Sequence, residues 1–151
     1  MNRTFKFNTL YIGILLLTIV FSSCTSSKQL AIQKSKTAQL SRKLGFTVNR
    51  KDDLPLLEEV SRWLGTPYRY GGTTRTGADC SGFVGAVYKN VYHKSLQRTV
   101  VNIYNKDCQR IGKRRLKPGD LVFFNFSKRK KRTLNHMGIY LKNGYFAHAR
   151  S

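Results

Sequence analysis

The chain has 151 residues, enough for one modest domain, and 40% of them are hydrophobic, which excludes a wholly disordered chain. Lysine and arginine number 28 against 7 aspartates and glutamates, so the formal net charge is +21. This charge favours polyanionic surroundings such as nucleic acid, an anionic membrane surface or a cell wall, and it does not choose among the three.

The N-terminus has the features of an export signal. Arg3 and Lys6 precede an apolar run over residues 10–21, which is too short for a comfortable membrane span. The run ends in Phe-Ser-Ser-Cys at residues 21–24. This motif resembles the signal of bacterial lipoproteins, which implies cleavage before Cys24 and lipidation of its sulfur. A plain secretory signal and a short membrane anchor are the alternatives. Export argues against a nucleic-acid partner, because chromosomal DNA and RNA lie on the other side of the membrane.

Three segments follow from this pattern. Residues 1–23 are the predicted signal peptide, and residues 24–50 are polar, which predicts a tether. Residues 51–151 carry the aromatic and apolar content of a folded domain. Besides Cys24, this leaves Cys80 and Cys108, and we expect Cys108 to be a partly buried thiol with no assigned role.

The domain is predicted to begin with a helix. Asp52 and Asp53 supply N-cap chemistry, Pro55 suits a first helical turn, and Gly65 with Pro67 would end the helix. The apolar positions recur at helical spacing, at Leu56, Val60, Trp63 and Leu64.

Two more helices are expected. A glycine-rich loop over residues 66–78 leads to Cys80, and the apolar residues after it again recur every three to four positions. Cys80 is therefore expected in the first turn of the second helix. A third helix is expected over residues 96–107.

Strands are predicted for the remainder. The Pro-Gly pair within residues 117–120 has the signature of a type II turn and leads into a strand at 121–126. Two further strands, 136–141 and 145–149, are separated by a tight turn. Helices followed by strands predict an α+β fold in which N-terminal helices pack on an antiparallel sheet.

The hairpin formed by the last two strands would bring two histidines together. A turn at Asn143-Gly144 pairs Ile139 with Ala147 and Leu141 with Tyr145, which leaves His136 and His148 close to a diagonal. One imidazole could then act as a base while the other orients it. A lone strand histidine is more often structural, and His93 is interpreted as a surface residue.

Cys80 is the candidate nucleophile. The amide dipoles of a helix N-terminus stabilise a thiolate, and a nearby imidazolium does so more strongly. The alternative is a buried cysteine that packs at the start of a helix. No metal and no other cofactor is expected.

Five sequence blocks in order resemble the NlpC-type cell-wall peptidase family, at residues 65–72, 79–84, 118–124, 136–140 and 146–149. The resemblance implies a papain-like domain that hydrolyses stem peptides of peptidoglycan, typically between D-glutamate and diaminopimelate. It implies that Cys80 is the nucleophile, His136 the general base and His148 the orienting residue. Tyr68 and Ser81 would contact the substrate or the oxyanion.

Family domains continue with further strands beyond the third catalytic position, so the resemblance also implies that the last strands of the sheet are missing after Ser151. The expected protein is a lipid-anchored peptidoglycan endopeptidase of the bacterial cell envelope. The alternative is a catalytically weak or inactive cationic lipoprotein that binds the cell wall. A basic run at residues 128–132 is either a solvated loop or a patch that adheres to anionic wall or lipid.

Overall fold

The structure is a computed structural model that describes the backbone of residues 9–126 and 133–150, and side chains from residue 27 onward within those ranges. The basic run at 128–132 and the side chain of Cys24 lie outside the described residues. The chain divides into two compact units, Met1–Arg50 and Lys51–Ser151.

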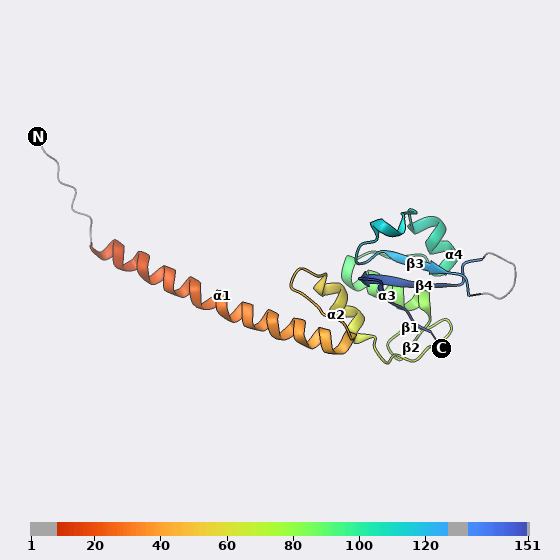
Figure 1. Cartoon of the computed structure of the whole chain (residues 1–151), viewed down its shortest axis with the longest axis horizontal. Coiled ribbons are helices and arrows are strands. Elements are labelled where there is room, and N and C mark those ends of the chain that lie inside the picture. Colours follow the sequence, from red (N-terminus) through yellow and green to blue (C-terminus); the bar gives the residue numbers. More distant parts are fainter. Residues whose placement is uncertain (1–8, 127–132, 151) are drawn as a thin grey trace, which may run out of the picture. The chain divides into compact units, whose positions relative to one another are not determined.

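The first unit contains one long helix, α1 (Thr9–Leu44) (Figure 1). Gly45, at a φ of +75°, follows the helix, and its amide donates to the carbonyl of Ser41. The segment interpreted as a polar tether is thus helical as far as Leu44. Within the part of the chain that the structure describes, no helix has the length and apolar content needed to cross a membrane.

The second unit begins with α2 (Leu54–Arg62), which confirms the first predicted helix of the domain. Asp53 is its N-cap and accepts a hydrogen bond from the amide of Leu56 at 3.1 Å. Asp52, the residue before this cap, pairs with the Lys142 ammonium group at 2.6 Å. Leu64 lies beyond the helix and is exposed, contrary to the predicted apolar face.

The nucleophile candidate begins α3 (Cys80–Tyr92), as predicted. A short antiparallel pair, β1 (Thr73–Thr74) and β2 (Gly77–Ala78), lies within the glycine-rich loop before it. The buried Glu59 carboxylate of α2 accepts hydrogen bonds from Trp63 and, across to α3, from Asn90 at 2.8 Å. These contacts join α2 to α3.

The third predicted helix is shorter than expected. It comprises α4 (Val100–Asn102) and a π-helical turn, Ile103–Asp107, so residues 96–99 are not helical. Two contacts explain the late start. The Thr99 hydroxyl caps α4, and the Asp107 carboxylate takes the amide of Gln97 at 2.6 Å. A 3₁₀ turn, Lys113–Arg115, precedes the sheet.

The main sheet has three antiparallel strands in the order β3–β4–β5: β3 (Leu121–Phe124), β4 (His136–Lys142) and β5 (Tyr145–Ala147). Strands β3 and β5 are each two residues shorter than predicted. The type II turn before β3 is confirmed, because Gly119 has a φ of +94° and the amide of Asp120 donates to the carbonyl of Lys117.

The predicted hairpin register is confirmed at Ile139, which pairs with Ala147. It is wrong at Leu141, because Tyr145 pairs with Lys142 and the register shifts between Tyr140 and Lys142. The cause is a two-residue turn in which both Asn143 and Gly144 have positive φ, so that Lys142 and Tyr145, on either side of the turn, pair directly. Leu141 is then an extra residue on β4, and the strand accommodates it as an irregularity.

Helix α3 packs against β4 and forms the core of the second unit (Figure 1). The core side chains are almost inaccessible to solvent, and they include Leu56, Val84, Val87, Ile103, Met137 and Ile139. The Tyr88 hydroxyl also donates to the carbonyl of Gly119 at 2.6 Å, which ties α3 to the turn before β3. The arrangement is the predicted α+β fold.

Candidate active site

Cys80 is held at the first position of α3 by its neighbour Asp79. One oxygen of the Asp79 carboxylate, Oδ1, accepts the amide of Gly82 at 2.7 Å and so caps the helix. The other, Oδ2, accepts the amide of Gly71 at 2.9 Å. A single buried carboxylate therefore fixes both the glycine loop and the start of the helix on which the thiol sits.

The loop and the helix lie too close together for side chains. A Cβ added at Gly82 would lie 2.0 Å from the carbonyl oxygen of Gly72, which is backbone and cannot move aside cheaply. Residue 82 must therefore be glycine for the loop to lie against the first turn of α3, which begins at Cys80.

The surroundings of the Cys80 thiol shift its pKa in opposite directions. Burial raises its pKa, and the negative charge of Asp79 acts in the same direction. Backbone hydrogen bonds from Met137, Ser81 and Cys80 itself favour the thiolate, but the net pKa is above the ordinary value. Because Met137 directly follows His136, the same contact brings that part of β4 to the sulfur.

The two histidines of the hairpin are hydrogen-bonded to each other. His136 Nε2 lies 2.9 Å from His148 Nδ1, and the rings are perpendicular. The predicted approach of the two imidazoles is therefore confirmed. His136 is buried, with 7% of its surface exposed, whereas His148 lies nearer the surface just past the end of β5. Gly138 allows this approach, since a Cβ there would lie 2.5 Å from the carbonyl oxygen of Ala147.

Aromatic rings surround the histidine pair. Phe126 lies against His136 at 5.1 Å between ring centroids, and Phe146 lies against His148 at 5.2 Å. Burial, followed by the influence of His148 and Arg150, lowers the pKa of His136 below its ordinary value of 6.5. Burial and Arg150 lower the pKa of His148 as well. The lowered pKa values favour the neutral form of both rings, and a neutral imidazole can accept a proton.

The sequence profile of the NlpC/P60 family matches residues 65–151, more than half of the chain. The chain belongs to the NlpC/P60 family. It is 43% identical over 94 residues to the probable endopeptidase NlpC of Escherichia coli, covering 62% of this chain and 59% of that protein. It is 40% identical over 92 residues to the murein DD-endopeptidase MepH of the same organism, covering 60% of this chain and 33% of that protein.

A solved NlpC/p60 domain, that of the peptidoglycan hydrolase SagA, has the same architecture. It matches with a TM-score of 0.56 and 30% identity, over 64% of this chain and 79% of that one. The curated relatives are longer, since this chain spans about three fifths and one third of their lengths. The match places all five sequence blocks within the NlpC/P60 domain.

A cavity of about 460 Å³ lies beside the nucleophile candidate of this NlpC/P60 domain. Tyr68, Cys80 and Ser81 line it, as does Asn135, which directly precedes His136. Tyr68 is 39% exposed on the wall of this cavity. The Ser81 hydroxyl donates a hydrogen bond to Asp79 and accepts one from Arg98. The backbone amide of Ser81 hydrogen-bonds to the Cys80 thiol.

Sequence reasoning missed Arg98, which also lines this cavity. It lies in the irregular segment before α4, and no local pattern distinguishes it from the many other basic residues of the chain. Its proximity to Cys80 arises from the tertiary fold.

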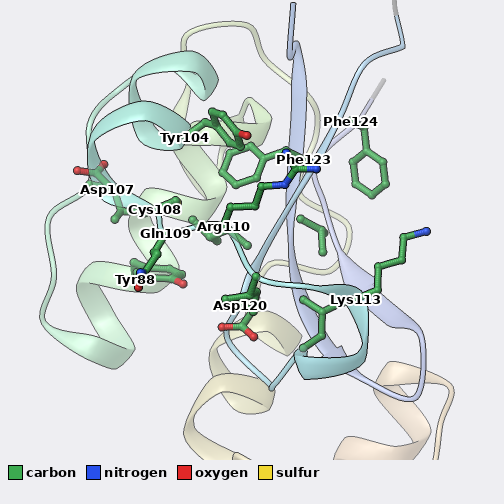
Figure 2. Close-up of a pocket in the computed structure, with 15 residues that line it drawn as sticks. Tyr88, Tyr104, Asp107, Cys108, Gln109, Arg110, Lys113, Asp120, Phe123 and Phe124 are labelled. Atoms are coloured by element: carbon green, nitrogen blue, oxygen red, sulfur yellow. The ribbon is translucent and has the colours of Figure 1, made fainter.

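A second cavity, of about 540 Å³, lies between α3, the π-helical turn and β3 (Figure 2). Tyr104, Cys108 and Phe123 contribute to its lining, and Cys108 is half-buried, as predicted. Cys80 and Cys108 are both free thiols. Among the described residues of this NlpC/P60 domain, no group of three or more His, Cys, Asp or Glu side chains could hold a metal ion.

Proposed function

We propose that this protein is a peptidoglycan endopeptidase of the cysteine type, in which Cys80 is the nucleophile, His136 the general base and His148 the residue that orients the base. The observation that carries the proposal is the part-buried hydrogen bond of 2.9 Å between His136 and His148. His136 begins β4, the strand whose next residue, Met137, directs its amide at the Cys80 sulfur. The murein DD-endopeptidase MepH and the peptidoglycan hydrolase SagA, to which this chain is similar, support peptidoglycan as the substrate.

The protonation states of Cys80 and His136 favour general-base catalysis. Burial raises the pKa of the Cys80 thiol and lowers that of the His136 imidazole, so the resting pair is neutral. His136 therefore accepts the thiol proton as the sulfur attacks the carbonyl carbon of the substrate. The resulting oxyanion would form at the N-terminus of α3, where the backbone amide of Cys80 can donate to it.

The remaining steps return the site to its starting state. His136 gives its proton to the leaving nitrogen, the C–N bond breaks, and an acyl group remains on the Cys80 sulfur. Water then attacks the thioester with His136 again as the base. The S–C bond breaks, and the thiol and a free carboxylic acid are restored.

The proposed bond is the one between D-glutamate and diaminopimelate in the stem peptide. A DD-endopeptidase such as the named relative would instead cut between two residues of D configuration. The two activities release different products. Cleavage after D-glutamate shortens the stems, whereas cleavage of a cross-link between two D centres converts dimers into monomers with intact stems.

We expect the full chain to convert purified peptidoglycan into fragments with shortened stems, identified by mass spectrometry after separation. A Cys108→Ala variant serves as the control and should give the same products, because Cys108 lines the other cavity. Monomers with intact stems would replace the proposed bond by a DD bond. Absence of any new product would contradict the enzymatic proposal.

The charge of +21 favours a second candidate, a cationic lipoprotein that binds the wall with little or no catalysis. This candidate predicts that the protein sediments with peptidoglycan in low salt and releases no soluble fragments. The product analysis above separates the two.

The lipid anchor is proposed on Cys24, with residues 1–23 removed as a signal. We expect wild-type protein to stay in the membrane fraction after a high-salt wash and to carry the mass of a lipid on Cys24. Cys24→Ser should be released by the same wash. The salt is needed because the positive charge alone could hold the protein on anionic lipid. A Cys24→Ser protein that remains bound, with its signal cleaved elsewhere, would contradict the anchor.

A further inference from the structure

Arg98 forms a two-pronged ion pair with the carboxylate of Asp79, the residue before Cys80. Its NH1 nitrogen donates to Asp79 Oδ1 at 3.1 Å, and its NH2 nitrogen donates to Asp79 Oδ2 at 2.7 Å. NH1 also donates to the Ser81 hydroxyl at 2.8 Å. The guanidinium thus contacts the residues on both sides of Cys80, and the two-pronged pairing fixes the plane of the carboxylate.

The Asp79 carboxylate is the centre of this arrangement. Besides the two bonds from Arg98, it accepts the amides of Gly71 and Gly82 and the hydroxyl of Ser81. Burial alone would raise its pKa, but the hydrogen bonds, of which that from Arg98 is the largest, hold the pKa of Asp79 below its ordinary value. Asp79 is therefore a buried anion whose orientation depends on its donors.

The same anion lies next to the thiol that must become a thiolate. The negative charge of Asp79 disfavours the charged form of Cys80, whereas Arg98 interacts favourably with it. Tyr68 is another titratable side chain near Cys80: burial, followed by the negative charge of the Cys80 thiolate, raises the pKa of Tyr68. On β4, His136 directly precedes Met137, whose amide hydrogen-bonds to the Cys80 sulfur. Without Arg98, an uncompensated buried carboxylate would face the nucleophile.

We propose that Arg98 is a positioning residue for the nucleophile, which acts through Asp79 by holding the glycine loop and the first turn of α3 in place and by neutralising the charge beside Cys80. The proposal rests on the assignment of Cys80 as the nucleophile. Arg98 itself need not touch the reacting atoms. Its 45% exposed side chain lies on the wall of the cavity beside the thiol.

The chain offers a matched control. Arg62 pairs with the buried Glu59 carboxylate at 2.9 Å, and its side chain is 58% exposed, so this ion pair resembles the Arg98–Asp79 pair in distance and exposure. It lies on α2, among residues that do not line the cavity beside Cys80. Arg62→Gln removes a comparable ion pair and leaves the surroundings of the nucleophile unchanged.

The test is the rate at which iodoacetamide alkylates Cys80 in the full chain, followed between pH 6 and 10 by mass spectrometry of the modified peptides. Only the thiolate reacts, so the rate reports the thiolate population and its access. For Arg98→Gln we expect alkylation of Cys80 at neutral pH to slow by about tenfold, the effect of one pKa unit, with the midpoint displaced to higher pH. Cys108, in the same molecule, should react at an unchanged rate.

Two further variants separate charge from geometry. Arg98→Lys keeps the charge but loses the two-pronged pairing, so we expect it to recover part of the Cys80 reactivity. In an Asp79→Asn background, Arg98→Gln should have little further effect, since Arg98 is proposed to act through the Asp79 carboxylate. In Arg62→Gln, Cys80 should be alkylated at the wild-type rate.

Two results would overturn the proposal. One is a Cys80 reactivity in Arg98→Gln that equals the wild-type reactivity across the pH range. The other is an equal slowing or acceleration of Cys80 and Cys108 together with a lower Tm, which would mean that Arg98 only stabilises the fold. Alkylation needs no peptidoglycan, so the result stands even if the wild-type protein cleaves none.

Discussion

Replacing Cys80 by alanine is expected to abolish peptidoglycan cleavage, with a loss of roughly a thousandfold or more, as is usual when a covalent nucleophile is removed. Without the sulfur no acyl intermediate can form, and a methyl group cannot substitute for it. The fold should survive, because Asp79 caps α3 through the amide of Gly82 and holds the glycine loop through the amide of Gly71, and neither bond involves the Cys80 side chain. Release of soluble fragments from purified peptidoglycan measures the effect, and the Tm of each variant reports the fold.

The control for this experiment is Cys108→Ala, which removes a half-buried thiol from the second cavity. It should cleave at the wild-type rate. A Cys80→Ala protein that is folded and cleaves as fast as Cys108→Ala would remove the cysteine mechanism from consideration.

The second large effect is expected at the histidine pair, and it should be unequal. His136→Ala removes the base and is expected to lower kcat/KM about as much as Cys80→Ala. His148→Ala removes the partner that holds the ring at 2.9 Å, so activity should fall by roughly 10- to 1000-fold but remain measurable. His148→Asn, which can still hydrogen-bond to the ring, should retain more activity than His148→Ala.

The rate of cleavage is expected to fall at low pH. A base acts only when it is neutral, and burial with its neighbours holds the pKa of His136 below 6.5. Cleavage should therefore be greater at pH 7 than below pH 6.5 and should decline as the pH falls through that lowered pKa. The profile of kcat/KM against pH measures this. An acid limb centred above pH 6.5, or equal losses in the two alanine variants, would contradict the assigned roles.

Local chemistry made several elements predictable from the sequence. The N-cap chemistry of Asp53 and the helix-ending Gly65 and Pro67 were enough to locate α2, and Asn143-Gly144 was enough to predict a hairpin. Because pairing within that hairpin follows from counting residues, the meeting of His136 and His148 could also be predicted.

The features that could not be predicted depend on contacts distant in the sequence or on fine backbone geometry. The irregularity at Leu141 depends on which residues of the turn adopt positive φ. The late start of α4 depends on a side chain, Asp107, that competes for a backbone amide. Arg98 carries no local sign of its contact with Asp79, since nineteen positions separate the two and only the packed fold brings them together.

The histidine pair and the thiol reach the site by different routes. His136 and His148 are twelve positions apart on one hairpin, so their meeting requires only that a local turn closes. Cys80 comes from a helix that must pack on β4 before its sulfur meets the Met137 amide. A chain in which the hairpin has closed but the helix has not docked would hold a base without a nucleophile. The three side chains would then form one site only once α3 has packed on β4, so the site depends on a long-range contact that the hairpin alone does not need.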